Sequence, residues 1–200
     1  MSGRLIALEG GEAVGKSTQA RLLAERLGAR LSFEPGATDL GARIRSLVLD
    51  RSAPSPADRT EALLMAADRA QHVAEVIRPA LDAGIHVVTD RFIGSSLCYQ
   101  GFGRGLGVDE VLALSLFATG GLRSDVNVLV EVSDEVARGR RMSPGDRIEA
   151  EDAAFHRRVT EGYRTLAEED PAHWVIVNGE GSVEEVAEAV FAAVRERLGV

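Results

Sequence analysis

The chain has 200 residues, 45% of them hydrophobic and 27% charged, and its formal net charge at pH 7 is −8. This length suits one domain with a substantial buried core. The acidic balance argues against a general nucleic-acid-binding surface, which would be basic. Cys98 is the one cysteine in the sequence, which excludes an intramolecular disulfide and a zinc cluster, and we interpret it as a small core residue rather than a nucleophile.

The N-terminal residues enter a predicted strand almost at once, without the basic region and long apolar segment of a signal peptide. No apolar run approaches the roughly 20 residues that a membrane span needs. We therefore expect a cytoplasmic protein with neither a membrane nor a nucleic-acid partner.

Short apolar runs alternate with longer amphipathic stretches along the whole chain. The predicted strands are 4–9, 30–33, 86–89, 127–132 and 174–177. The predicted helices are 16–27, 40–49, 58–83, 108–117, 135–141, 150–169 and 183–198. This alternation is typical of parallel βαβ units, so we expect an α/β fold, a five-stranded parallel sheet with helices on both faces. Ligands of such folds bind beyond the carboxyl ends of the strands, which makes the residues after each strand the candidates for chemistry.

The first predicted strand is followed by the motif G-x-x-x-x-G-K-S, which spans residues 10–17. Its glycines let several backbone N–H groups point at one phosphate chain, and the helix that follows adds its positive N-terminal end. Lys16 is the only lysine among 23 basic residues, and we expect its ammonium to reach the β- and γ-phosphates of a bound nucleotide. The Ser17 hydroxyl is expected to help hold Mg²⁺. The residues predicted to hold the nucleotide phosphates are Gly10, Gly11, Glu12, Ala13, Val14, Gly15, Lys16, Ser17 and Thr18.

Asp90 and Arg91 follow the third predicted strand. An aspartate at this place can bind Mg²⁺ together with the serine of the phosphate loop, directly or through water. The neighbouring arginine can hold phosphate oxygens with two parallel hydrogen bonds. A surface Asp-Arg pair is the alternative, but a phosphate loop in the same sheet favours the binding role.

Two further stretches suggest a pocket for the rest of a nucleotide. Met65 and Arg69 lie four residues apart, so they share one face of the helix predicted for 58–83 and could contact a base. Spacing alone favours a different interpretation, a core methionine beside a solvated arginine. In 94–101 small hydroxyls and an amide suggest contacts to a sugar or a base. Ser95 or Ser96 could instead cap a helix, and both roles can hold together.

The segment 138–147 gathers arginines in an otherwise acidic chain: Arg138, Arg140, Arg141 and Arg147. Two glycines and a proline within it predict a mobile loop between helices. Such a loop can close over the phosphates of a nucleotide, exclude water and supply positive charge. A solvated basic loop is the alternative.

Further short motifs accompany the phosphate loop in a fixed order. The stretches are 9–19, 34–36, 62–64, 67–71, 90–91, 95–96, 99–101, 103–105 and 146–149. In this order and spacing they resemble bacterial thymidylate kinase, a nucleoside monophosphate kinase, over nearly the whole chain. The resemblance implies a P-loop NTPase-type three-layer sandwich that forms one kinase domain over 1–200, with an arginine-rich lid at about 138–150. It also implies transfer of the γ-phosphoryl group of ATP to dTMP, a requirement for Mg²⁺, and a homodimer.

The resemblance implies roles for individual residues of the acceptor site. Glu12 matches an acidic residue near the sugar 3′-hydroxyl and the phosphate of the acceptor. Arg91 matches the arginine that binds this phosphate, and Arg69 matches an arginine that donates a hydrogen bond to the thymine ring. Tyr99 matches a tyrosine packed against the deoxyribose, where a 2′-hydroxyl would fit poorly. The whole implied substrate-binding set is Glu12, Glu34, Met65, Arg69, Arg91, Ser96, Tyr99 and Gln100.

A catalytic arginine is also implied. Family members with a small residue inside the phosphate loop supply this arginine from the lid, and Ala13 is such a residue. Arg147 is the leading candidate because it belongs to the matching stretch 146–149. The alternative is that it pairs with Asp146 or Glu149 and only shapes the lid. The implied catalytic set is Lys16, Arg91, Arg140 and Arg147, with Arg138 and Arg141 also placed on ATP.

Several positions depart from the family's usual residues. Met65 stands in place of a base-stacking phenylalanine, Phe33 in place of an arginine, and Phe92 in place of a tyrosine. The phosphate machinery is intact, so these departures concern the acceptor base more than the reaction. The alternatives are a kinase for another acceptor, such as dUMP, a cytidine nucleotide or a modified deoxynucleotide, and a nucleotide-binding regulator without turnover.

Overall fold

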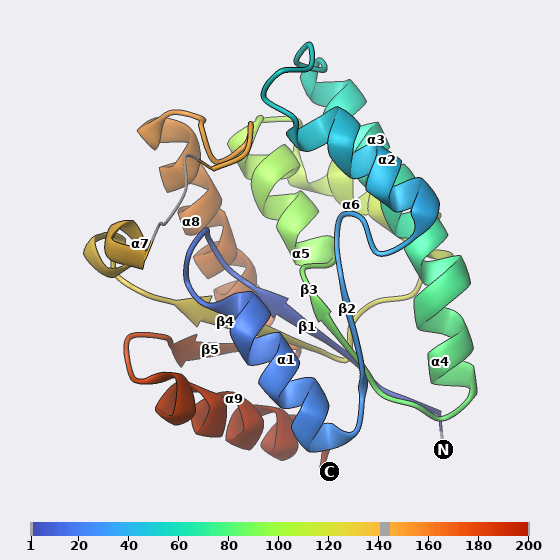
Figure 1. Ribbon diagram of the computed structural model, residues 1–200, viewed down its shortest axis with the longest axis vertical. Coiled ribbons are helices and arrows are strands. Elements are labelled where there is room, and N and C mark those ends of the chain that lie inside the picture. Colours follow the sequence, from blue (N-terminus) through green and yellow to red (C-terminus); the bar gives the residue numbers. More distant parts are fainter. Residues whose placement is uncertain (1, 141–144, 200) are drawn as a thin grey trace.

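The computed structural model describes residues 2–140 and 145–199, and within them five strands form one sheet (Figure 1). Their order across the sheet is β2-β3-β1-β4-β5, and every neighbouring pair is parallel. The strands are β1 (Leu5–Glu9), β2 (Arg30–Phe33), β3 (Val87–Asp90), β4 (Val126–Glu131) and β5 (Trp174–Asn178). Because β1 occupies the centre, the phosphate loop that follows it lies in the middle of the carboxyl edge of the sheet.

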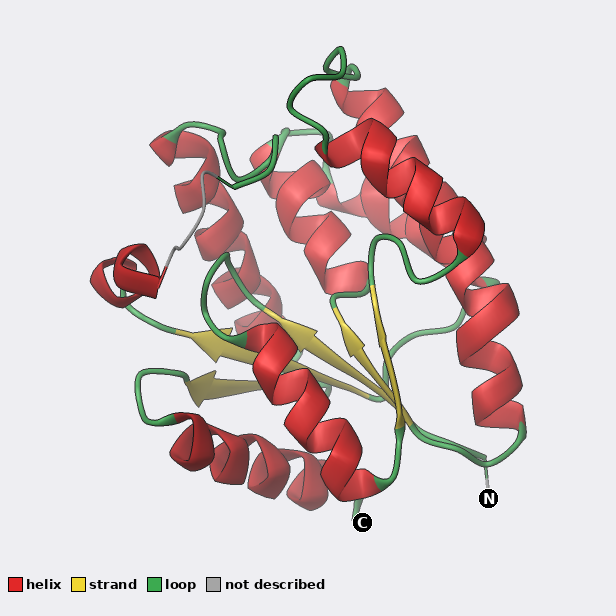
Figure 2. Ribbon diagram, in the orientation of Figure 1, coloured by secondary structure: helices red, strands yellow, loops and turns green. Residues whose placement is uncertain are grey.

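Helices cover both faces of the sheet (Figure 2). One layer holds α1 (Lys16–Leu27) and α9 (Val183–Leu198), which pack against each other. The other layer holds the remaining long helices, α2 (Asp39–Leu49), α3 (Asp58–His72), α6 (Val108–Thr119) and α8 (Ala153–Glu169). The shorter elements are η1 (Val73–Ile77), α4 (Arg78–Asp82), α5 (Ile93–Ser96), η2 (Leu97–Gly103) and α7 (Asp134–Arg140).

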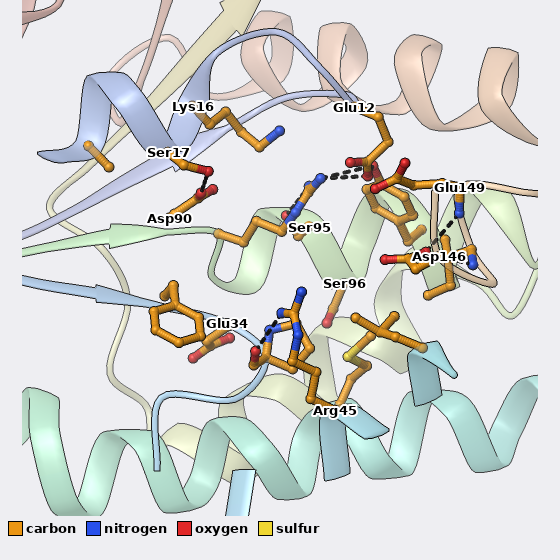
Figure 3. Close-up of a pocket in the computed structure, with 18 of the residues that line it drawn as sticks. Glu12, Lys16, Ser17, Glu34, Arg45, Asp90, Ser95, Ser96, Asp146 and Glu149 are labelled. Atoms are coloured by element: carbon orange, nitrogen blue, oxygen red, sulfur yellow. Dashed lines mark hydrogen bonds and ion pairs between the residues drawn. The ribbon is translucent and has the colours of Figure 1, made fainter. Parts of the chain in front are cut away.

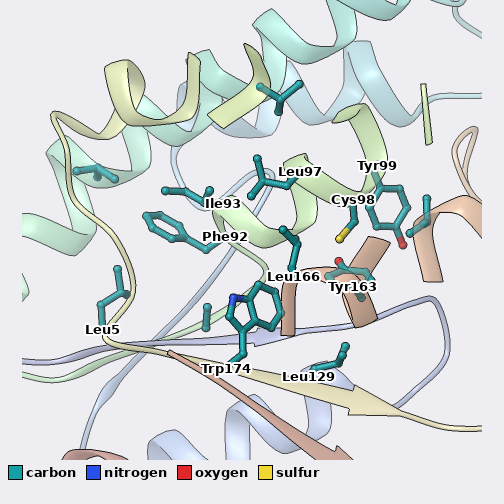
Figure 4. Close-up of a cluster of buried hydrophobic side chains, with 14 of the residues drawn as sticks. Leu5, Phe92, Ile93, Leu97, Cys98, Tyr99, Leu129, Tyr163, Leu166 and Trp174 are labelled. Atoms are coloured by element: carbon teal, nitrogen blue, oxygen red, sulfur yellow. The ribbon is translucent and has the colours of Figure 1, made fainter. Parts of the chain in front are cut away.

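The central strand is buried on both sides, which explains the uninterrupted apolar run of β1. Alternate residues face opposite layers, so Leu5 joins one core and Ile6 the other. The core on the side of α8 also contains the aromatic rings of Phe92, Tyr163 and Trp174 (Figure 4). Because β1 is packed on both faces, the end of this strand holds the phosphate loop in a fixed position.

The predicted α/β fold with a five-stranded parallel sheet is confirmed. The strand predicted for 30–33 and the helices predicted for 16–27 and 183–198 have the observed bounds. The helix predicted for 58–83 is interrupted by the π-helical turn η1 and ends at Asp82. Among the helices of the described residues, none has the length and apolar character that crossing a bilayer requires.

The helix predicted for 150–169 begins later, at Ala153. Asp152 caps it, because a carboxylate oxygen accepts a hydrogen bond from the backbone N–H of Phe155 at 2.7 Å. The cap at Asp152 therefore sets the start of α8, three residues later than the hydrophobic pattern predicted.

Two helical elements, α5 and η2, were not predicted. Ser95 and Ser96 lie inside α5 and Phe92 takes its N-cap position, so the alternative interpretation, in which Ser95 or Ser96 caps a helix, is wrong. Glycines and serines have low helix propensity, and here burial overrides it. Gly94 is needed for this packing, since a Cβ there would lie 2.8 Å from a Glu9 carboxylate oxygen.

Candidate active site

A cavity of about 720 Å³ lies beyond the carboxyl ends of β1, β2 and β3 (Figure 3). The phosphate loop and the start of α1 line one side of it, and α3, α5 and η2 line another. Most of the predicted site residues meet here. Those that line the cavity are Glu12, Ala13, Gly15, Lys16, Ser17, Thr18, Glu34, Met65, Arg69, Asp90, Arg91, Ser96, Tyr99, Gln100 and Arg140.

The backbone of the phosphate loop is shaped by its glycines. Gly10 has a φ of 138°, and a Cβ there would lie 2.5 Å from the carbonyl oxygen of Val130. Gly15, with a φ of 98°, takes the N-cap position of α1, and no side chain caps this helix. The first-turn N–H groups are therefore available to an anion such as a phosphate. Gly11 and Val14 do not line the cavity and contribute through the backbone instead.

Lys16 is 6% exposed, and its Nζ donates a hydrogen bond to the carbonyl oxygen of Gly11. Burial, together with the nearby charge of Arg91, lowers the pKa of this ammonium to about 8. A phosphate chain in the loop would bring negative charge next to Lys16. Its binding therefore favours the charged form of the lysine.

Ser17 and Asp90 form an oxygen pair at the base of the loop, where the hydroxyl donates to Oδ2 at 2.5 Å. Mg²⁺ prefers hard oxygen ligands, and proteins usually hold it through one or two carboxylates, waters and the phosphates of a substrate. The pair fits this requirement. Within 2–140 and 145–199, no group of three or more His, Cys, Asp or Glu side chains could hold a metal alone. Waters and the phosphates of a nucleotide would complete the ligand set.

Arg91 is fixed between the phosphate loop and η2. Its φ is 72°, in the left-handed region that residues other than glycine rarely adopt. Nη2 donates to Glu12 Oε1 at 2.6 Å and to the Tyr99 hydroxyl at 3.2 Å, and Nη1 donates to the carbonyl oxygen of Gly10 at 3.0 Å. Burial raises the pKa of Glu12, but the charges of Arg91 and Lys16 outweigh it and bring this pKa to about 2. Glu12 is therefore ionised and holds the guanidinium.

Tyr163, on α8, also holds the Arg91 guanidinium, and it was not selected as a site residue from the sequence. Its hydroxyl accepts a hydrogen bond from Arg91 Nη1 at 3.2 Å and lies 2.9 Å from Ser95 Oγ, which donates to Glu9 at 2.6 Å. Burial raises the pKa of the Glu9 carboxyl and of the Tyr163 hydroxyl. A tyrosine on the apolar face of a helix has the pattern of a core residue, so no local signal marks it.

Arg69 is 3% exposed, so the solvated position that spacing alone favoured is wrong. Nε donates to Glu34 Oε2 at 2.9 Å, Nη1 to Ser96 Oγ at 3.0 Å, and Nη2 to the carbonyl oxygen of Phe92 at 2.9 Å. Each of the three guanidinium nitrogens thus donates a hydrogen bond within the protein, so the Arg69 side chain forms a fixed part of the cavity wall. Met65 is half-buried and does two things, since it lines the cavity and packs against the core.

Two carboxyl groups, those of Glu34 and Asp68, lie next to Arg69 and also line the cavity. Glu34 accepts from Arg69, and its Oε1 lies 2.9 Å from Nδ1 of His72. Asp68 lines the cavity and accepts from the backbone N–H of Gly36 at 2.9 Å. Burial and the charge of Glu34 raise the pKa of Asp68 to about 6. Asp68 was missed as a site residue, although it stands next to Arg69 in a stretch that carried the resemblance.

Arg45, on α2, is another cavity residue that sequence reasoning missed (Figure 3). Its Nη1 donates to the carbonyl oxygen of Pro35 at 2.8 Å, which holds the side chain at the end of β2. Arg43 lies two residues earlier in the same helical pattern, so spacing offered no reason to select Arg45.

A family model described as "Thymidylate kinase" matches residues 8–190. The chain belongs to the thymidylate kinase family. The thymidylate kinase of Leifsonia xyli subsp. xyli is 49% identical to it, over 98% of this chain and 94% of that protein. A thymidylate kinase of Synechococcus sp. (strain JA-2-3B'a(2-13)) is 45% identical, over 96% of this chain and 95% of that protein. The crystal structure of thymidylate kinase from Ehrlichia chaffeensis has a TM-score of 0.81 at 25% identity, covering 98% of this chain and 100% of that chain.

Among the predicted lid arginines that the structure describes, Arg140 lies beside the phosphate loop. Its Nη1 donates to the carbonyl oxygen of Val14 at 3.3 Å and its Nη2 to that of Gly179 at 3.0 Å, and the side chain lines the cavity. Arg138 is exposed and does not line the cavity, while Arg141 lies outside the described residues. Of the predicted lid arginines within the described residues, Arg140 is thus the one that lies beside the phosphate loop and lines the cavity, and its role on the phosphates of ATP stays a prediction.

Arg147, the leading candidate from the sequence, lies elsewhere and does not line the cavity. Its Nη2 donates to Glu61 Oε2 at 2.6 Å, and its Nε donates to the carbonyl oxygen of Val48 at 2.6 Å. A buried carboxylate and a helix-end carbonyl hold this guanidinium away from the phosphate loop. The geometry favours Arg140 over Arg147 at the transferred phosphoryl group, and the catalytic role of either residue stays a prediction.

Proposed function

We propose that the chain transfers the γ-phosphoryl group of ATP to the phosphate of dTMP, giving ADP and dTDP. One observation supports this most directly. A continuous cavity is lined by a phosphate loop and by the buried, immobilised Arg69, and the Arg91 guanidinium is bonded to the loop at Gly10. Membership of the thymidylate kinase family, matched over residues 8–190, supports thymidylate as the acceptor.

In this reaction the bond between the γ-phosphorus and the oxygen that bridges it to ADP breaks. A phosphate oxygen of dTMP forms the new bond to the same phosphorus. Charge spreads over the transferring oxygens, so alignment and fixed positive charge supply the catalysis. Lys16 provides this charge from the loop, Arg91 from the end of β3, and Arg140 from α7. We assign no general base.

Ser17 and Asp90 are the residues that would hold Mg²⁺, because their oxygens lie together beneath the loop. When bound, Mg²⁺ neutralises negative charge on the β- and γ-phosphates. Glu12 has a different task, since it holds the Arg91 guanidinium at 2.6 Å and so directs it toward the acceptor phosphate.

The acceptor base would lie against Met65 and Ser96. Arg69 donates to Ser96 Oγ at 3.0 Å, which leaves the hydroxyl hydrogen of Ser96 for an acceptor atom such as a base carbonyl. Met65 supplies a flexible apolar surface where an aromatic ring would be rigid. The sugar would lie against Tyr99.

We also propose a homodimer. The helices α3 and α6 pack together, and each carries a large apolar side chain on its outside, Leu63 at 58% and Phe117 at 87% exposure. We place the dimer contact on these two helices, because a partner subunit there would cover both exposed apolar side chains. Each subunit would be one kinase domain with its lid at about 138–150, working in the cytoplasm, where ATP, Mg²⁺ and dTMP are available.

A panel of acceptors tests the proposed function. ADP release is measured with dTMP, dUMP, dCMP and the ribonucleotide UMP, with Lys16→Ala as the control for contaminating kinases. The highest kcat/KM is expected with dTMP. A higher value with another monophosphate overturns dTMP as the acceptor, and ATP binding without ADP release from any of them supports a regulator instead.

A further inference from the structure

Glu61 is a carboxylate with 0% exposure that lies outside the cavity. It accepts hydrogen bonds from Gln100 Nε2 at 2.9 Å, from Arg104 Nη2 at 2.9 Å and from Arg147 Nη2 at 2.6 Å. Burial raises the pKa of Glu61, but the hydrogen bonds from Arg104, Arg147 and Gln100 outweigh it and lower this pKa. The carboxylate is therefore ionised, and it joins residues that are far apart in the sequence.

Arg147 ties this carboxylate to the segment 145–150. Its Nε donates to the carbonyl oxygen of Val48 at 2.6 Å, and its backbone N–H donates to that of Leu49 at 3.1 Å. The segment is thus pinned at one residue to the C-terminal end of α2 and to α3.

The pinned segment is part of the cavity wall. Asp146, Ile148 and Glu149 line the cavity, and Figure 3 shows the first and last of them there. Asp146 Oδ1 accepts from the backbone N–H groups of Ile148 and Glu149, at 2.9 Å each, so the turn is compact. Ile148 is 5% exposed and belongs to the core. This wall is therefore held at two points, by the buried Ile148 side chain and by the contacts of Arg147.

Glu61 also connects Arg147 to Gln100. The Gln100 amide donates to Glu61, and the Gln100 side chain lines the cavity next to Tyr99. Members of a buried charge cluster depend on one another, since removing one leaves the other charge buried without a partner. Glu61 accepts from both Arg147 and Gln100, so loss of the Arg147 bond is expected to shift the carboxylate that holds Gln100, although Arg104 remains as its other charged partner.

We propose that Arg147 is a positioning residue for the acceptor nucleotide. Through Glu61 it fixes Gln100 and the 145–150 wall of the cavity, whereas Arg140 serves the donor phosphates. The inference rests on the proposed function, since it names the substrate that each arginine serves. Loss of Arg147 then weakens the binding of dTMP and has little effect on ATP or on the chemical step.

Steady-state kinetics of Arg147→Met and of its matched variant Arg140→Met test this division. For Arg147→Met, KM for dTMP is expected to rise about tenfold, while kcat and KM for ATP change by less than about threefold. For Arg140→Met the expected pattern is reversed, with a lower kcat and an unchanged KM for dTMP. A fall in kcat of more than about tenfold for Arg147→Met at unchanged KM for dTMP overturns the proposal, and so does the absence of any effect.

A double-mutant cycle tests transmission through Glu61. Because Arg147 and Gln100 both act through this carboxylate, the effects of Arg147→Met and Gln100→Ala on KM for dTMP are expected to combine non-additively. The control pair is Arg147→Met with Arg4→Ala, since Arg4 pairs with Asp125 at 2.7 Å at the amino edge of the sheet. Additive effects in the Gln100 cycle contradict the proposal.

The conservative variant Arg147→Lys separates positioning from simple charge. A lysine ammonium can reach Glu61 but cannot also donate to Val48 from a second nitrogen, so partial recovery of the KM for dTMP is expected. A merely structural role would instead lower the affinities for ATP and dTMP together with the melting temperature. Equal losses for both substrates therefore overturn the proposal.

Wild-type turnover of dTMP tests the proposed function separately. If the wild type released no ADP with dTMP, the proposed function would fail. Calorimetric binding of dTMP to the wild type and to Arg147→Met would still test the inference. Equal affinities of the two proteins for dTMP overturn it.

Discussion

The Ser17 hydroxyl lies 2.5 Å from Oδ2 of Asp90, although 73 positions separate the two residues. The parallel pairing of β1 with β3 explains this, because Leu8 and Asp90 are opposite each other in the register. The chain thus brings one oxygen from the phosphate loop and one from the neighbouring strand end to the same point. A cation that bridges the donor phosphates would meet both.

Ser17→Ala and Asp90→Asn are each expected to lower kcat by about 100-fold, because each removes an oxygen placed where charge develops on the phosphates. Both variants should also need a higher Mg²⁺ concentration for half-maximal rate, which a Mg²⁺ titration of ADP release measures. Ser52→Ala is the matched control, since Ser52 Oγ donates to Asp50 at 2.7 Å in an exposed loop. An unchanged Mg²⁺ requirement in both site variants would contradict the metal assignment.

The pH dependence of the reaction should report Lys16. The pKa of its ammonium is lowered to about 8, and kcat/KM follows the ionisation of the free enzyme. The charged lysine binds phosphate, so kcat/KM for ATP is expected to fall as the pH rises through this value. Lys16→Ala should lower kcat by orders of magnitude and lose this alkaline fall. If Lys16→Ala keeps more than about a tenth of the wild-type kcat, the role assigned to Lys16 is wrong.

Tyr99 is expected to exclude ribonucleotides. Its ring packs against Phe155 and Tyr163, with centroids 6.1 and 6.4 Å away, and its hydroxyl donates to Glu12. The ring therefore forms a fixed wall where the sugar would lie. Tyr99→Phe should keep most of the preference for dTMP over its ribo counterpart, and Tyr99→Ala should relax it. The ratio of kcat/KM for the two acceptors measures this, and an unchanged ratio in Tyr99→Ala rules the prediction out.

Asp68 should make stability depend on pH. Its pKa is raised from 3.8 to about 6 in the native state, so the native state binds more protons than the unfolded chain between these values. This contribution to stability is present at low pH and is lost as the pH rises through about 6. Relative to wild type, Asp68→Asn is therefore expected to be more stabilising at pH 7.5 than at pH 4.5. Urea unfolding at both pH values measures the difference.

The exposed Asp82→Asn change on α4 is the control for this measurement, because it removes a solvated carboxylate. A pH effect of the same size in both variants would mean that burial of Asp68 is not the cause.

Phe117 should contribute to the proposed dimer. It is 87% exposed on α6, and an arginine there would place a charge where a partner surface must be apolar. Phe117→Arg is expected to shift the protein toward monomer in sedimentation velocity. Ile85→Arg is the control, since Ile85 is 46% exposed but lies outside α3 and α6. A wild-type monomer, or a Phe117→Arg dimer of unchanged affinity, would refute the placement of the interface.

The order of strands and helices, the parallel sheet and the phosphate loop could all be predicted from the sequence. Their signals are local: apolar periodicity sets the type of each element, and the spacing of Gly10, Gly15 and Lys16 specifies a phosphate-binding turn. The same kind of reasoning missed α5 and η2, because burial against the sheet outweighs the low helix propensity of their glycines and serines.

The sequence by itself determined that this chain is an α/β kinase-like protein with its chemistry at the carboxyl edge of the sheet, because backbone periodicity and loop motifs act over a few residues. Which arginine does what was decided only by the tertiary structure. Arg140 and Arg147 cannot be distinguished within a basic segment of the sequence. In the structure, Arg140 donates to the carbonyl oxygen of Val14, whereas Arg147 donates to Glu61, which lies 86 positions away. A guanidinium takes its role from the acceptors around it, and those acceptors come from elements that only the packed fold brings together.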